Sequence, residues 1–324
     1  MNSTAAPVTI CVVPRERFSC AVGSLKNLIA NTSDPYKLIY IDGNSPAEIA
    51  QQLAEICAEQ GFAYHREDTY LSPNAARNLA LQFVDTPFVA FVAFVDNDLY
   101  VDSGWLENLL QCARDTGTWA VTPTVLEGEG SLQVIHLAGG DLIEERANGF
   151  NRIHQRHRYM KQPLRNVAKD LRREAVGSFE FHCVLLRTDV FAEKTFLDEG
   201  FLSHQEHLDL AREIRRAGGN VYFEPKAIVR YDNARPFEQY DQAYFELRWG
   251  EEWTMKSIEH AREKWGLAPN DEGLEKLAMW TSRHRRLFQQ SQRSWKLHTL
   301  PLVAKRSIGA WLRKRKLLPD RSPF

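Results

Sequence analysis

An uninterrupted apolar stretch, Phe88 to Val95, runs directly into three polar residues, Asp96, Asn97 and Asp98. Because neither face of the stretch carries a polar side chain, it predicts a strand buried on both faces, as in a parallel sheet flanked by helices. Ligands of such sheets bind beyond the carboxyl ends of the strands. Two carboxylates at that position suit Mg²⁺ or Mn²⁺, which prefer oxygen ligands and bridge to substrate phosphates. The alternative is an Asx-rich turn that precedes the next helix.

The first 125 residues alternate between predicted strands and predicted helices. The strands are expected at 8–13, 37–41, 62–65, 88–95 and 119–125, and the helices at 19–30, 46–60, 75–83 and 103–115. Strict alternation predicts the α/β class, with a doubly wound, mostly parallel sheet. Right-handed connections place helices on both faces of that sheet.

The pattern is less regular beyond residue 125. The basic stretch 151–173 is expected to form either a mobile loop over the site or a solvated helix. The other expected elements are strands at 133–142, 176–187, 221–224 and 227–231, and helices at 205–217, 237–265, 271–292 and 301–316. We therefore predict a sheet-bearing domain, 1–235, followed by a helical extension, 236–324.

The composition is that of an ordinary globular protein, with 44% hydrophobic and 26% charged residues in a chain of 324. A net charge of -1 gives no argument for nucleic acid as a partner. Five cysteines are scattered without metal-site spacing, as expected of buried thiols in a reducing compartment. The N-terminus lacks the charged and apolar regions of a signal peptide, and no stretch is apolar enough to span a bilayer. We expect a cytoplasmic protein.

Polar residues at two other strand ends and helix starts are candidates for binding a nucleotide. Asp42 ends the strand 37–41, so its carboxylate can accept hydrogen bonds from a ribose hydroxyl or a base N–H, or else only form a turn. Asn74 and Arg77 lie on one face at the start of the helix 75–83, where a helix N-terminus suits a diphosphate. The alternative for Arg77 is a surface ion pair.

Several motifs together resemble those of a GT-A-fold, family 2-like glycosyltransferase. They are, in order, the first strand leading into Pro14, YIDGNS, SPNAARNLAL, VDND, GSFEFHCVLLR and FLDEGFLSHQEHLDLAREIRRAGG. The resemblance covers about residues 8–232. It implies a GT-A fold with a helical C-terminal extension, and a donor that is a sugar nucleotide, UDP- or GDP-linked.

The resemblance also implies roles for residues at the donor side. Asp96 and Asp98 resemble the DXD motif, in which Asp98 would bind the metal and Asp96 the ribose or a metal-bound water. Arg77 would contact the donor phosphate or ribose. The other donor-binding candidates are Pro14, Arg15, Glu16, Asp42, Asn74 and Asn97. Mn²⁺ or Mg²⁺ is the implied cofactor, and it would neutralise the leaving diphosphate.

The segment around Glu206 resembles the Glu-Asp-x-Asp-Leu segment of the family, where a carboxylate acts as general base on the acceptor hydroxyl. Here His207 stands where the family usually has Asp. Glu206, His207 and Asp209 are all candidates for the base, with Glu206 favoured and His207 next. Histidine suits such a role at neutral pH. The alternative for the two carboxylates is favourable charge in the first turn of a helix.

Two positions on the remaining strands complete the predicted site. Tyr231 occupies the place where relatives often carry a metal-binding histidine, so Asp232 is the candidate for a further metal ligand. His182, on the acceptor side, is a candidate for contacting a sugar, although a lone histidine on such a strand is more often a hydrogen-bonded core residue.

These features predict an inverting glycosyltransferase of glycan or polysaccharide biosynthesis, acting on a glycan or lipid-linked acceptor. The alternatives are a non-catalytic glycan-binding or scaffolding module on the same fold, a sugar-nucleotide nucleotidyltransferase, and a retaining transferase. The basic, tryptophan-containing segment from Ser294 to Lys316 has the composition of an interfacial helix on anionic lipid, so peripheral contact with the inner face of the membrane is compatible with the sequence. A homodimer through the helical extension is equally compatible.

Overall fold

The structure, a computed structural model, describes residues 8–33, 35–85, 89–128, 133–191, 197–231 and 236–286. Within these ranges a 10-stranded sheet follows the order β10-β12-β6-β11-β4-β1-β2-β3, with β5 paired to β12 and β7 to β6. Its strands are β1 (Val8–Val13), β2 (Tyr36–Gly43), β3 (Ala63–Glu67), β4 (Phe91–Asp96), β5 (Leu99–Val101), β6 (Ala120–Glu127), β7 (Val134–Leu137), β10 (Glu174–Val176), β11 (Cys183–Arg187) and β12 (Val221–Tyr231).

The central strand β4 is buried on both faces, as its sequence predicted. Val92 and Phe94 pack into one hydrophobic cluster, and Ala93 and Val95 pack into the other. Alternate side chains of a strand point to opposite faces, so two apolar faces require two covering layers. The strand pairs in parallel with β1 and antiparallel with β11, and it carries the polar residues after Val95 to the carboxyl edge.

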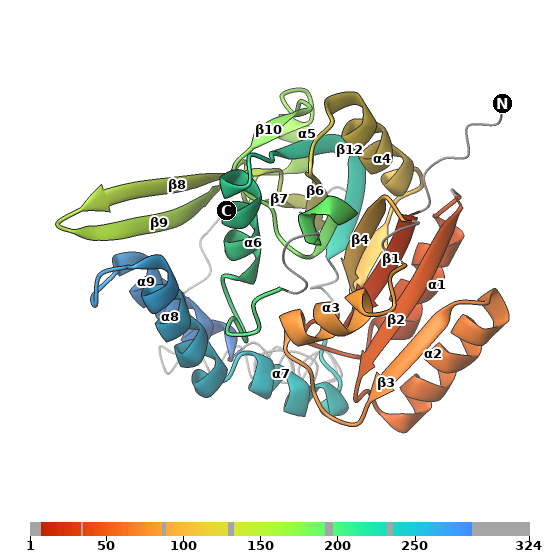
Figure 1. The fold of residues 1–324 in the computed structure, drawn as a ribbon. Coiled ribbons are helices and arrows are strands. Elements are labelled where there is room, and N and C mark those ends of the chain that lie inside the picture. The colour runs from red at the N-terminus through yellow and green to blue at the C-terminus, as the bar shows by residue number, and fades with distance from the viewer. Residues whose placement is uncertain are drawn as a thin grey trace, which may run out of the picture.

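Helices supply these two layers (Figure 1). The helices α1, α2 and α4 cover one face, with Leu25, Leu53 and Leu109 in a shared core. The helices α3 and α6 cover the other face, with Ala80 and Ile214. Their bounds, with that of the short α5, are α1 (Ala21–Ala30), α2 (Ala47–Gln60), α3 (Pro73–Leu81), α4 (Trp105–Thr116), α5 (Leu164–Val167) and α6 (Glu206–Arg216). The α/β class predicted from the alternation is confirmed.

Four strands in succession, β3-β2-β1-β4, are parallel, and β12 and β6 form a second parallel pair. The neighbour of β4 on the other side is β11, which is antiparallel to both β4 and β6. After β6 the chain forms β7 and β10 at other positions of the sheet, and it then enters β11 at the carboxyl edge of β4, where Cys183 pairs with Val95. The residues that precede β11 therefore lie beside the polar end of β4.

A hairpin stands out from the sheet and corrects the prediction for residues 151–157, whereas 158–173 contain turns and the short helix α5. The strands β8 (Gly140–Ala147) and β9 (Phe150–His157) pair antiparallel over their full length and project from the body of the molecule (Figure 1). The expected loop or solvated helix was wrong here because the turn residues Asn148 and Gly149 both adopt positive φ, 52° and 83°. Asn-Gly is a strong hairpin signal, and β8 satisfies the backbone of the basic strand.

Two other boundaries differ from the prediction. The strand β12 is continuous, and its register shifts between Glu224 and Ile228, so Pro225 sits at an irregularity where its missing N–H is tolerated. The predicted helix 237–265 is divided into a 3₁₀ turn (Gln239–Asp241), α7 (Gln242–Arg248) and α8 (Glu251–Trp265). A side chain at Gly250 would lie 2.8 Å from a carbonyl oxygen of α7, so the chain turns at that glycine.

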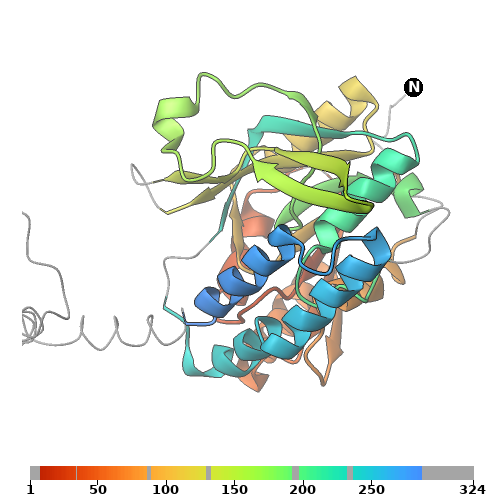
Figure 2. The ribbon, with the colours of Figure 1, turned by 90° about the vertical axis from the view of Figure 1, so that its left-hand side faces the viewer.

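The C-terminal helices pack onto the hairpin and onto α6. The helices α8 and α9 (Glu272–His284) lie side by side beneath β8 and β9 (Figure 2). Their shared core contains Ile153, Leu208, Ile258, Trp265 and Leu274. The extension is thereby brought next to the first turn of α6.

All five cysteines are buried thiols, as predicted. Each helix within the described ranges is too short or too polar to cross a bilayer. The predicted basic segment from Ser294 to Lys316 and the candidate ligand Asp232 lie outside the described residues.

Candidate active site

The polar end of β4 is buried and fixed to the segment that follows β1. Asp96, Asn97 and Asp98 are 2%, 1% and 0% exposed. The Asn97 side chain accepts a hydrogen bond from the backbone N–H of Arg15 at 3.2 Å and donates one to the carbonyl of Arg17 at 2.9 Å. Its amide therefore joins the two strand ends, and the flanking carboxylates take their positions from it.

The Arg15 guanidinium lies between three carboxylates. Its Nε is 3.4 Å from Oδ2 of Asp96, and its Nη1 is 3.4 Å from Oδ2 of Asp98 and 3.2 Å from Oε1 of Glu16. The guanidinium also lies over the ring of Tyr231, 4.3 Å from its centre. Such a group offsets part of the negative charge of the two aspartates.

One oxygen of Asp98 is left over from this arrangement. Among the described residues Oδ1 of Asp98 is buried and has no hydrogen-bond partner. Burial is the main cause that raises the pKa of Asp98 to about 6; Arg15 opposes this effect, while Glu16 and Asp96 add to it. A buried carboxylate oxygen without a partner fits a divalent cation, because such ions take carboxylate oxygens and compensate their charge.

A second set of charges lies on the other side of Asp96. Nη2 of Arg77 is 3.5 Å from Oδ1 of Asp96, and Nη1 of Arg77 is 3.8 Å from Oε1 of Glu206. Arg248, from α7, approaches the same Glu206 oxygen at 3.6 Å. Asn74 accepts a hydrogen bond from Arg77 at 3.3 Å and donates one to the Asp198 carbonyl at 2.8 Å. The start of α3 and the start of α6 are thereby joined.

The residues after β1 are tied to the C-terminal helices. Glu16 is fully buried, accepts a hydrogen bond from the Tyr231 hydroxyl, and accepts another from Nε1 of Trp249 at 2.9 Å. Burial raises its pKa, but Arg15, His284 and Arg17 outweigh that effect and hold the pKa well below its usual range. The Pro14 carbonyl accepts a hydrogen bond from the Tyr244 hydroxyl at 3.3 Å.

Asp42 ends β2 with its acceptor capacity in use. One oxygen accepts from the backbone N–H of Ser45 at 2.9 Å, and the other accepts from the Ser45 hydroxyl at 2.8 Å, from the Tyr64 hydroxyl at 2.6 Å and from Arg66. The turn that follows has an unusual backbone geometry, since Asn44 has a φ of 69°. The carboxylate of Asp42 is therefore held by Ser45, Tyr64 and Arg66, and these hydrogen bonds do not involve Asp96.

The first turn of α6 separates its three candidate bases. Asp209 accepts hydrogen bonds from Nζ of Lys264 at 2.8 Å and from Nε1 of Trp265 at 3.1 Å, so both of its oxygens face α8. His207 lies 3.1 Å from Oε1 of Gln155 through its Nε2. Since that oxygen only accepts, Nε2 carries the hydrogen and Nδ1 keeps a lone pair. Burial is the largest cause that lowers the pKa of His207, which favours the neutral ring.

Residues 9–191 match the profile of glycosyl transferase family 2, which is more than half of the chain. The chain belongs to glycosyl transferase family 2. No curated protein matches it significantly.

A solved structure shows that this family 2 chain has the GT-A fold. The crystal structure of GalNAc-T7 with UDP, GalNAc and Mn²⁺ is similar with a TM-score of 0.54 at 16% sequence identity. The match covers 93% of this chain and 59% of that one, so the family 2 chain spans little more than half the length of its neighbour. The predicted family and fold are confirmed.

Most of the predicted site residues of this family 2 chain form one contiguous network. It contains Pro14, Arg15, Glu16, Asn74, Arg77, Asp96, Asn97, Asp98, His182 and Glu206. Asp42 and Asp209 have their hydrogen bonds elsewhere, as described above.

Several residues of this site were not predicted from the sequence. His136 on β7 and Glu180 before β11 lie next to His182, and Arg248 on α7 lies next to Glu206. Burial lowers the pKa of His136, but hydrogen bonds to Glu127 and Glu180 outweigh it and raise the pKa to about 9. The predicted strand 176–187 would place Glu180 and His182 on one face, so their spacing was a signal that could have been read.

Proposed function

We propose that this chain is a metal-dependent glycosyltransferase that moves a sugar from a nucleoside-diphosphate donor to an acceptor hydroxyl. The proposal depends chiefly on one observation, the alternation of Arg15 and Arg77 with Asp96 and Asp98 at the carboxyl edge of a family 2 domain. Guanidinium groups hold diphosphates in bidentate geometry, and carboxylates hold divalent cations. An edge with both can bind both halves of a metal-bound sugar nucleotide.

On the donor side, Arg77 and Arg15 would contact the diphosphate, with Asn74 and Asn97 holding the two arginine-bearing segments in place. Asp42 would act at the nucleoside through Arg66, because its own oxygens already accept hydrogen bonds from four groups. UDP is the first donor nucleotide to test, since the structural neighbour was crystallised with it.

Asp98 would hold Mn²⁺ or Mg²⁺ through the oxygen that has no partner among the described residues, with Asp96 on the ribose or on a water of the ion. Asp232, which lies outside those residues, stays the candidate for a further ligand. When bound, the cation supplies charge that stabilises the leaving diphosphate. Around it, Arg15 offsets the charge of both aspartates while Asn97 fixes their spacing.

For the general base the geometry favours His207 over the other two candidates. Glu206 is paired with Arg77 and Arg248, and Asp209 is bound by α8. Nδ1 of His207, kept unprotonated by the hydrogen on Nε2 and by the lowered pKa of the ring, can remove the proton of an acceptor hydroxyl. Because it comes from a different segment than the metal ligands, a single displacement with inversion is the reaction we propose.

The acceptor would be a glycan or a lipid-linked sugar, in glycan or polysaccharide biosynthesis at the inner face of a membrane. His182, which is 5% exposed and lies beside Asp96, is the proposed acceptor contact. The basic composition of the segment from Ser294 to Lys316 supports a peripheral contact with anionic lipid. Pairing of two chains through the helical extension is part of the same proposal.

The test is a screen of UDP and GDP and their sugars with the full chain, with and without Mn²⁺ or Mg²⁺. Thermal shift reports binding, because a ligand of the folded state raises its melting temperature. Release of nucleoside diphosphate, with and without oligosaccharide acceptors, reports turnover. We expect one base to shift the melting temperature only with metal and its sugar nucleotide to be turned over. If no nucleotide shifts the protein with either metal, the donor site is wrong.

A further inference from the structure

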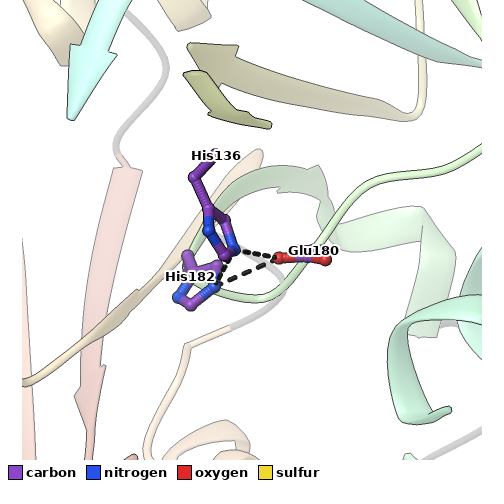
Figure 3. A group of neighbouring side chains, drawn as sticks. All are labelled: His136, Glu180 and His182. Carbon is purple, nitrogen blue, oxygen red and sulfur yellow. Dashed lines mark hydrogen bonds and ion pairs between the residues drawn. The ribbon is translucent and has the colours of Figure 1, made fainter. Parts of the chain in front are cut away.

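A cluster of two histidines and one glutamate lies next to the donor carboxylates, since its His182 contacts Asp96. His136 comes from β7, while Glu180 and His182 come from the turn that enters β11 (Figure 3). Nε2 of His136, Nε2 of His182 and Oε2 of Glu180 are each 3.1 Å from the other two. Three potential ligand atoms thus form an equilateral triangle.

Hydrogen bonds alone do not account for all three sides of this triangle. Each Nε2 carries at most one hydrogen, and the carboxylate carries none when ionised. If both histidines donate to Glu180, two N–H groups face each other at 3.1 Å; if only one does, a nitrogen lone pair faces a carboxylate oxygen. With Glu180 ionised, one side of the triangle is therefore repulsive whichever of the two histidines carries a hydrogen on Nε2.

A metal ion makes all three contacts favourable. Zn²⁺ lies about 2.0–2.2 Å from histidine nitrogen and carboxylate oxygen. Neighbouring ligands at such bond lengths are about 3.0 Å apart in an octahedral site and about 3.3 Å apart in a tetrahedral one. The observed 3.1 Å lies between these two separations.

The groups around the triangle are those that orient metal ligands. Nδ1 of His136 is 2.5 Å from Oε1 of Glu127, and Nδ1 of His182 is 3.3 Å from Oδ2 of Asp96. Oε1 of Glu180 is 3.2 Å from Nε2 of His157. A carboxylate hydrogen-bonded to the far nitrogen of a ligating histidine, as Glu127 is to His136, fixes its tautomer and leaves Nε2 with the lone pair that a metal needs. Nδ1 of His182 faces Asp96 without a hydrogen bond.

We propose that His136, Glu180 and His182 bind a first-row transition-metal ion, Zn²⁺ in the first instance, at a site separate from the donor metal of Asp98. Two imidazoles and one carboxylate favour such an ion over Mg²⁺ or Ca²⁺, which take oxygen ligands. The three protein ligands leave at least one coordination position for water or substrate. His136 and Glu180 keep 16% and 15% of their side chains exposed, so the ion can be reached from solvent.

The same carboxylates also favour a proton on His136, so a cation binds there in competition with that proton. A protonated, metal-free hydrogen-bond cluster is the rival interpretation. The two differ in one measurable respect, which is whether the folded chain retains an equivalent of metal that depends on these three side chains.

The experiment measures Zn²⁺ bound per chain, and its dissociation constant, for the full chain stripped with a chelator and then reloaded. The variants are Glu180→Gln and His136→Gln, neither of which touches Asp96 through the altered side chain. The matched controls are His154→Gln, an exposed histidine of β9, and Asp98→Asn, which removes the proposed donor-metal ligand. Circular dichroism checks that each variant is folded, and the spectrum of bound Co²⁺ gives the ligand geometry of the unaltered chain.

We expect one tight Zn²⁺ in the unaltered chain and in both controls, and affinity weaker by roughly 100-fold in Glu180→Gln and His136→Gln. Glu127→Gln, which alters the partner of Nδ1 of His136 and also the carboxylate bound by Lys161, should weaken binding by about 10-fold. Tight binding that survives both triad variants but disappears in Asp98→Asn would place the ion at the donor site and overturn the proposal. Failure of the unaltered chain to retain Zn²⁺ would overturn it in favour of the protonated cluster. Neither readout uses a nucleotide, so the outcome is independent of the proposed transferase activity.

Discussion

Asp96 and His182 are in contact, with Oδ2 of the aspartate 3.3 Å from Nδ1 of the histidine. The contact joins the carboxyl end of β4 to the turn that enters its antiparallel neighbour β11. Asp96 also faces Arg15 and Arg77. One carboxylate therefore links the proposed donor edge to the histidine–glutamate cluster. Substitutions on either side should alter the position or charge of groups on the other.

Replacing Asp98 with asparagine should abolish metal-dependent binding of the donor nucleotide. The substitution keeps the shape of the side chain but removes the charge that would hold the cation, so the melting-temperature increase with nucleotide and Mn²⁺ should disappear, and kcat should fall by about 100-fold or more. The control is Asp68→Asn, whose side chain is 99% exposed. An unchanged nucleotide shift in Asp98→Asn would refute the role given to this carboxylate.

Replacing His207 with glutamine should reduce kcat by roughly 10²–10⁴-fold while changing KM much less, because the variant cannot take up a proton. His207→Asp should recover part of the loss, since an aspartate at this position can act as the base. Asp209→Asn serves as the comparison in the same helix turn, and its effect should be on stability. Equal losses of kcat in the two variants would argue against a specific role for the histidine.

The pH profile offers a second test of His207. Burial lowers its pKa, so the ring is neutral at pH 7 and becomes protonated only as the pH falls below about 6.5. The rate should therefore be constant near neutrality and decline on the acid side, and the acid limb should move to lower pH in His207→Asp. A profile with an acid limb unchanged by that substitution would assign the limb to another group.

Replacing Glu206 with glutamine should destabilise the protein rather than only slow it. Glu206 is the common partner of Arg77 and Arg248, so its loss takes the carboxylate away from the buried Arg248 guanidinium and leaves the buried Arg77 with Asp96 alone. Removing one partner of a buried ion pair typically costs about 3–5 kcal/mol. Urea denaturation of the variant and of the exposed control Glu275→Gln measures the difference. A stable but inactive Glu206→Gln would return this residue to first place as the base.

His204 should make the protein less stable in mild acid. Burial, followed by the positive charge of Arg248 and the neighbouring His207 and His284, lowers its pKa well below the usual value of 6.5. The unfolded chain therefore takes up a proton on His204 near pH 6.5 while the folded chain does not, so this contribution to stability is complete above that pH and is lost as the pH falls. The unfolding free energy of His204→Gln should depend less steeply on pH between 7 and about 5.

The donor edge could be predicted because its signal is local. The residues from Phe91 to Asp98 encode both a buried strand and the polar groups at its end. Arg77 lies three residues after Asn74, at the start of a predicted helix. His136 and Arg248 could not be found in this way, because they reach the site from a side strand and a C-terminal helix. Their proximity depends on the antiparallel return of β11 and on the packing of α7, which no short pattern in the sequence specifies.

The contacts between the segment after β1 and the C-terminal helices affect when the site can form. Asp241 accepts hydrogen bonds from the backbone N–H groups of Phe18 and Ser19, and Trp249 donates one to Glu16, across separations of 223, 222 and 233 residues. Domains generally fold from the N-terminus during synthesis, and contacts of such long range form late. A nascent chain can therefore assemble the parallel strands early, but its donor edge stays incomplete until Asp241 and Trp249, the residues that flank α7, have left the ribosome.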